Sequence, residues 1–64
     1  MSEVSPTLAV WLYALRLFGQ REKALTWMAT PLPELGGRTP EQVIAQDPDA
    51  VEAILDRIQY GVFS

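Results

Sequence analysis

The stretch from residue 31 to residue 40, Pro31-Leu-Pro-Glu-Leu-Gly-Gly-Arg-Thr-Pro40, decides the fold of this chain because it interrupts an otherwise helix-compatible sequence. Its prolines lack backbone donors and fix φ, and its adjacent glycines permit positive φ, so one helix must end before it and another must begin after it. Thr39 followed by Pro40 is typical of an N-cap and the first helical residue. Leu32 and Leu35 are expected to point inward, which indicates an ordered corner rather than a flexible linker.

The composition limits the possible classes of protein. The 64 residues are expected to form a single domain, and a domain of this size buries only about 60% of its unfolded surface. The sequence contains neither cysteine nor histidine, which excludes disulfides and metal sites built on thiolate or imidazole. A net charge of −3 disfavours direct binding to nucleic acid. The sequence shows neither a bilayer-spanning apolar stretch nor a secretory signal, so we expect a cytoplasmic protein that does not bind membranes.

Capping residues that directly precede proline mark three helix starts: Ser5-Pro6, Thr39-Pro40 and Asp47-Pro48. They predict helices over residues 6–18, 40–47 and 48–60, and a shorter helix over 20–29 lies between the first two. Gly19 is expected to close the first helix in a left-handed conformation, and Gly61 is expected to close the last helix. The predicted fold class is therefore all-α, a small bundle of about four short helices.

The last predicted helix has the clearest amphipathic pattern, with a core face formed by Val51, Ile54, Leu55 and Ile58. The first predicted helix is instead apolar on nearly its whole circumference. One stripe contains Leu8, Trp11, Leu12, Leu15 and Phe18, and the opposite stripe contains Val10, Tyr13, Ala14 and Leu17. A domain this small has too few elements to bury both stripes, so one of them must meet another surface.

We expect a homo-oligomer that self-associates through Val10, Tyr13 and Leu17, because an isologous contact needs only a self-complementary surface. A contact with a different protein, or a surface once covered by a further domain, explains the same pattern.

Residues suited to catalysis are few. Nucleophilic catalysis lacks its usual base, because the sequence contains no histidine. The carboxylate pairs Asp47/Asp49 and Glu52/Asp56 are better explained by helix capping and by a solvated surface. The glycine pair of the corner lacks the lysine and serine of a phosphate-binding loop, and Trp27 lies at core spacing. We therefore expect no enzymatic activity, no catalytic residue, no cofactor and no metal.

Four segments together resemble the toxin-binding domain of the Xre/MbcA/ParS antitoxins. They are ALRLFG at residues 14–19, KALTWM at 23–28 with Pro31 following, LGGRTP at 35–40, and ILDRIQYGVFS at 54–64. The similarity runs from about Leu12 to the last residue, and its most specific parts are the Leu-Gly-Gly-x-Thr-Pro corner and the Tyr-Gly-Val-Phe-Ser ending.

The resemblance implies a bacterial type II toxin–antitoxin system in which this domain binds a RES-domain, NAD-consuming toxin and blocks its active site. By position in the family, the toxin-binding residues are Arg57, Tyr60, Gly61, Val62, Phe63 and Ser64. Tyr and Arg are also the residue types that most often anchor protein interfaces. Only a few residues precede the first helix, so we expect no N-terminal helix-turn-helix. The alternative function is a non-catalytic helical oligomerisation module that has kept the fold without a toxin partner.

Overall fold

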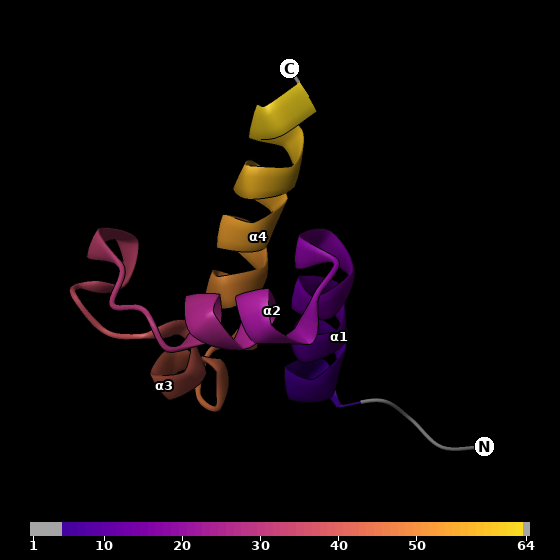
Figure 1. The fold of residues 1–64 in the computed structure, drawn as a ribbon. Helices are drawn as coiled ribbons and strands as arrows, with labels where there is room; N and C mark the ends of the chain where they lie inside the picture. Colours follow the sequence, from indigo (N-terminus) through magenta and orange to yellow (C-terminus); the bar gives the residue numbers. More distant parts are fainter. Residues whose placement is uncertain (1–4, 64) are drawn as a thin grey trace.

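The computed structural model describes residues 5–63 of the chain. Its elements are α1 (Pro6–Phe18), α2 (Arg21–Met28), the short 3₁₀ helix η1 (Pro33–Leu35), α3 (Pro40–Ile44) and α4 (Pro48–Phe63). Helix α4 packs against α1 on one side and α3 at its base, and α2 crosses the bundle near the same level (Figure 1). The prediction of an all-α fold is confirmed. None of the helices in residues 5–63 combines the length and apolarity needed to cross a bilayer.

The predicted caps are present at all three helix starts. Ser5 Oγ accepts a hydrogen bond of 3.1 Å from the amide three residues later, and Asp47 Oδ1 accepts one of 3.3 Å in the same way. At α3 the cap is reciprocal: Thr39 Oγ1 accepts from the Gln42 amide at 3.2 Å, and Gln42 Oε1 accepts from the Thr39 amide at 2.9 Å. Each cap gives a side-chain acceptor to an amide of the first helical turn, and the amides of Gln42 and Ala50 also donate to the carbonyl of the capping residue.

The corner between α2 and α3 is ordered by its own backbone. The Leu32 amide donates to the Arg38 carbonyl at 3.0 Å, and the Gly37 amide donates to the Leu32 carbonyl at 2.9 Å. Gly36 and Gly37 take φ values of 68° and 86°, in the left-handed region that favours glycine. Leu35 packs against the core and Leu32 is half-buried, so the prediction of an ordered corner is confirmed.

The core lies where α1, α2 and α3 meet the first half of α4. Its fully buried side chains include Met28 and Leu55, which are both 0% exposed. All of its buried residues are apolar: Val10, Ala14, Ala24, Met28, Val43, Ile44, Val51, Ile54 and Leu55. Ile58, predicted to complete the core face of the last helix, is only half-buried, because it lies farther along α4 where fewer elements surround the helix.

Two predicted helix ends are wrong. Helix α4 continues through Gly61 to Phe63, and Gly61 does not take a positive φ; a glycine permits a left-handed C-cap but does not impose one. Helix α3 ends at Ile44 rather than Asp47, because the amides of Gln46 and Asp47 both donate to the Val43 carbonyl, at 3.0 and 2.8 Å, in a tight final turn.

Both apolar stripes of α1 contribute to the core, which differs from the prediction that one stripe as a whole faces outward; Trp11, Leu15 and Phe18 of the first stripe also pack against the core. Val10 and Ala14 are 4% and 0% exposed and lie in the core. Leu8 and Leu12, on the other stripe, are 48% and 45% exposed. A helix that is apolar all round gives no signal for its inward face, and here the shorter side chains of Val10 and Ala14 lie inside, where helices pack most closely.

Candidate functional site

The second half of α4 leaves the core and forms the most prominent surface of the molecule. Figure 1 shows its last turns rising beyond the ends of the other helices. On this part of the helix Arg57, Tyr60 and Gly61 are exposed, and Tyr60 is 67% exposed. Spacings of three and four residues bring them onto one side of the helix. We call these three residues the α4 face.

The α4 face contains three of the six residues predicted to bind a partner. Val62 and Phe63 continue the same helix, but their side chains lie outside the part of the chain that the structure describes. Ser64 lies outside the described residues altogether.

Tyr13 fixes the angle at which α4 leaves the core. Its hydroxyl, on α1, is within hydrogen-bonding distance of Asp56 Oδ1 and Gln59 Oε1, both on α4. A phenol has a single hydrogen, and the carboxylate is the stronger of these two acceptors. The hydrogen bond to Asp56, followed by burial and the negative charge of Asp56, raises the pKa of Tyr13 to about 12.

The residues predicted to mediate self-association already make contacts within the chain. Val10 is buried in the chain's own core, and Tyr13 uses its hydroxyl within the chain. Leu17 is half-buried and packs against the core. The exposed apolar face of α1 is instead formed by Leu8 and Leu12.

A hollow of about 280 Å³ separates α4 from α2 and the corner. Arg57 reaches it from the α4 face, together with Ile54 and Ile58 from the same helix. Trp27 lines it from α2, and Leu32 and Glu34 complete the wall. Within residues 5–63, Arg57 forms no ion pair, so its charge is available to a partner. We call this space the α4 hollow.

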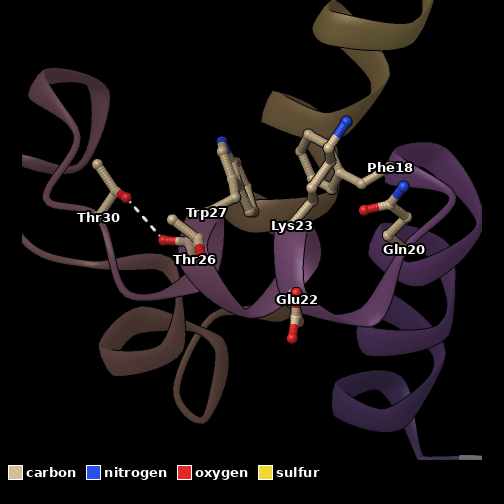
Figure 2. A pocket seen from close by; sticks show the side chains of 7 residues that line it. All are labelled: Phe18, Gln20, Glu22, Lys23, Thr26, Trp27 and Thr30. Atoms are coloured by element: carbon tan, nitrogen blue, oxygen red, sulfur yellow. Dashed lines mark hydrogen bonds between the residues drawn. The ribbon is translucent and has the colours of Figure 1, made fainter.

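A second, larger hollow of about 550 Å³ lies along α2 and is drawn in Figure 2. Phe18 and Trp27 form its apolar wall, with ring centroids 5.6 Å apart and planes tilted by 40°. Lys23 points to the same side of α2 as these rings, whereas Glu22, at the edge, points the other way (Figure 2). We call this space the α2 hollow.

Sequence reasoning missed the α2 hollow because it assigned Trp27 to the core. That assignment holds in part, since Trp27 is half-buried and packs against the core. The remainder of its ring system lines both hollows. A usable signal was present: Lys23 and Trp27 are four residues apart and therefore lie on the same side of a helix.

Two of the four carboxylates weighed in the sequence have structural roles. Asp47 caps α4 and Asp56 accepts the Tyr13 hydrogen bond. Within residues 5–63, no group of three or more carboxylate, thiol or imidazole side chains is arranged to hold a metal ion. The arrangement of exposed aromatic, aliphatic and cationic side chains around two shallow hollows suits protein–protein contact.

Comparison with known proteins gives two matches. The model of the antitoxin Xre/MbcA/ParS C-terminal toxin-binding domain matches residues 14–61. The protein "Antitoxin Xre" of Yersinia enterocolitica serotype O:8 / biotype 1B is 41% identical over 54 residues, which cover 80% of this chain and 36% of that relative. The chain therefore spans about a third of the length of the curated relative that it matches. No solved structure matches the chain significantly.

Proposed function

The chain belongs to the family of Xre/MbcA/ParS antitoxin C-terminal toxin-binding domains, and we propose that it neutralises a RES-type, NAD-consuming toxin by covering the toxin's active site with the C-terminal half of α4. It acts in a bacterial type II toxin–antitoxin system in the cytoplasm and has no catalytic role of its own. The toxin-binding residues are Arg57, Tyr60, Gly61, Val62, Phe63 and Ser64.

The observation that carries this proposal is the position of the α4 face. Arg57 and Tyr60 are exposed on a helix end that extends beyond the core, where a partner can reach them without unfolding the domain (Figure 1). An exposed Tyr side chain on a rigid helix loses little conformational freedom relative to the contact area it offers, and both Tyr and Arg are enriched among residues that dominate binding energy.

Gly61 adds a second argument. A glycine inside a helix destabilises it by roughly 0.5–1 kcal/mol relative to alanine. Among the described residues, a Cβ built at Gly61 would meet no atom within 4 Å, so packing against these residues does not require glycine there. The absence of a side chain allows another molecule to approach the α4 backbone closely, beside Tyr60 and Arg57.

The experiment measures NAD consumption by the cognate RES-domain toxin, titrated with the chain and its variants. Tyr60→Ala is expected to raise the inhibitory concentration at least about fivefold, since interface hot spots cost more than about 1 kcal/mol on truncation. A version that ends at Gly61 is expected to lose inhibition. Leu25→Ala is the matched control, because Leu25 is 47% exposed and lines neither the α4 hollow nor the α2 hollow.

Gly61→Ala separates binding from folding. The substitution is expected to stabilise the domain by about 0.5 kcal/mol and to weaken inhibition several-fold, because the new methyl group occupies space that the toxin uses. A destabilised or misfolded variant cannot produce that combination. The proposal is refuted if the full chain fails to inhibit the toxin, or if the version ending at Gly61 inhibits as well as the full chain.

We also propose self-association, now assigned to the exposed face of α1. Leu8 and Leu12 are 48% and 45% exposed and lie one turn apart, so they form an apolar strip that a second copy can cover by two-fold symmetry. Analytical ultracentrifugation over a concentration series tests it: the wild-type chain is expected to dimerise and Leu12→Glu to remain monomeric. A wild-type chain that stays monomeric at high concentration contradicts it. Dimerisation without toxin binding favours an oligomerisation module instead.

A further inference from the structure

We infer that the toxin binds this chain on two adjoining surfaces, the α4 face and the α2 hollow. In the α2 hollow, a toxin segment places an apolar side chain against Phe18 and Trp27 and a carboxylate beside Lys23. This inference rests on the proposed function, because it takes the toxin to be the molecule bound at the α4 face.

The two surfaces are continuous through Trp27. This residue lines the α2 hollow together with Phe18 and Lys23, and it also lines the α4 hollow together with Arg57. Helix α2 crosses the bundle below the projecting turns of α4 (Figure 1), and Trp27 lines the hollow that lies between the two helices. A partner that contacts Arg57 and follows the surface past Trp27 therefore also reaches α2.

The area required for stable binding favours the extension. Specific protein complexes use roughly 20–30 residues from each partner. The last turns of α4 provide too few residues to reach that range. The α2 hollow, at about 550 Å³, is the larger of the two concave surfaces that meet at Trp27, and it can accommodate side chains of a partner.

The side chains of the α2 hollow define what it receives. The tilted ring pair of Phe18 and Trp27 offers an apolar wall whose partly exposed rings gain from contact with an aliphatic or aromatic side chain. Lys23 is exposed and, within residues 5–63, forms no ion pair, while the neighbouring Glu22 points away from it (Figure 2). A carboxylate is the group that complements this lysine.

The match with the toxin-binding family favours the toxin, rather than a second copy of the chain, as the molecule that binds in the α2 hollow. The matched residues, 14–61, include Phe18, Lys23, Trp27 and Arg57. The exposed leucines of α1, Leu8 and Leu12, lie before the matched residues. The α2 hollow therefore belongs to the part of the chain that the family shares, and the strip assigned to self-association does not.

The test compares two charge reversals on α2. Lys23→Glu places a negative charge in the α2 hollow, whereas Arg21→Glu makes the same change on the other side of the helix, about 200° away. Affinity for the cognate RES-domain toxin is measured by isothermal titration calorimetry, and circular dichroism confirms that each variant is folded. Lys23→Glu is expected to raise Kd at least about tenfold, and Arg21→Glu to change it by less than about twofold.

Thr26→Trp provides a second variant, because Thr26 is exposed and lines the α2 hollow, which the larger side chain fills. It is also expected to raise Kd at least about tenfold. The inference is overturned if both variants bind like the wild-type chain while Tyr60→Ala weakens binding. It is also overturned if the two variants change the oligomeric state of the chain without toxin, measured as its molecular mass in solution, and leave its affinity for the toxin unchanged. If the wild-type chain itself does not bind, the proposed function has failed instead.

Discussion

Replacing Tyr13 with phenylalanine removes the hydroxyl that joins α1 to α4 and leaves the aromatic ring in place. The hydroxyl reaches Asp56 and Gln59 in a partly buried position. A hydrogen bond to a charged group contributes about 1.5–3 kcal/mol when it is well protected, and an average one about 0.5–1.5 kcal/mol. Because Asp56 is half-buried and water can replace the lost donor, we expect a loss of about 1 kcal/mol.

The expected loss for Tyr13→Phe is a large fraction of the total free energy of unfolding. A domain of 64 residues has an unfolding free energy of roughly 3–10 kcal/mol, at about 0.05–0.15 kcal/mol per residue. The corresponding fall in Tm is about 4–8 °C. Urea denaturation followed by circular dichroism at neutral pH measures the free energy. Tyr60→Phe is the matched control, because the Tyr60 side chain is 67% exposed and its hydroxyl is expected to contribute less than about 0.5 kcal/mol.

The pH dependence of the unfolding free energy identifies the Tyr13 hydrogen bond as the cause of the stabilisation. The pKa of Tyr13 is about 12 in the folded chain and about 10 when unfolded. The folded state therefore holds the proton more tightly, so the stabilisation is fully present below about pH 10 and is lost as the pH rises toward 12. The difference in unfolding free energy between the wild type and Tyr13→Phe is expected to shrink over this range. A difference that is absent at neutral pH, or constant up to pH 12, would refute the reasoning.

Other substitutions test the core, one helix end and one cap. Leu55→Ala, at a side chain that is 0% exposed, is expected to cost about 2–5 kcal/mol in urea denaturation; a loss below about 1 kcal/mol would mean that α4 does not pack as described. Gly19→Ala forces a left-handed φ of 75° on a residue with a Cβ and is expected to cost about 1–2 kcal/mol, so an unchanged Tm would contradict the assigned C-cap. Thr39→Ala removes the side-chain acceptor of the Gln42 amide, which keeps its bond of 3.0 Å to the Thr39 carbonyl, and is expected to cost about 1 kcal/mol in urea denaturation; an unchanged free energy of unfolding would argue against the capping box.

Most of the fold could be predicted because its helix starts are local. Ser5, Thr39 and Asp47 each cap a helix whose first residue is a proline, and this signal depends on neighbouring residues alone. The end of α4 could not be predicted in the same way, since Gly61 is compatible with both a cap and a continuing helix. The inward face of α1 was also undetermined, because it depends on which side α4 approaches and both stripes are apolar.

The candidate site, like the fold, could be predicted from the sequence only in part. The resemblance to a family predicted Arg57, Tyr60 and Gly61, and the structure places all three on one exposed face. The α2 hollow was not predicted, because the spacing of Trp27 indicates burial and does not reveal that part of the ring stays accessible. That information arises only when α2 is placed against the end of α1 on one side and beside the corner and α4 on the other.

The first half of α4 is buried and its second half projects from the core, so substitutions in the two halves have different effects on the domain. Substitutions at Val51 or Leu55 are limited by the core, where each lost methylene group lowers the folding free energy. Substitutions at Arg57 or Tyr60 change the surface offered to a partner at little cost to folding. Within a single helix, therefore, the choice of partner can drift from one lineage to the next while the scaffold that presents it stays the same.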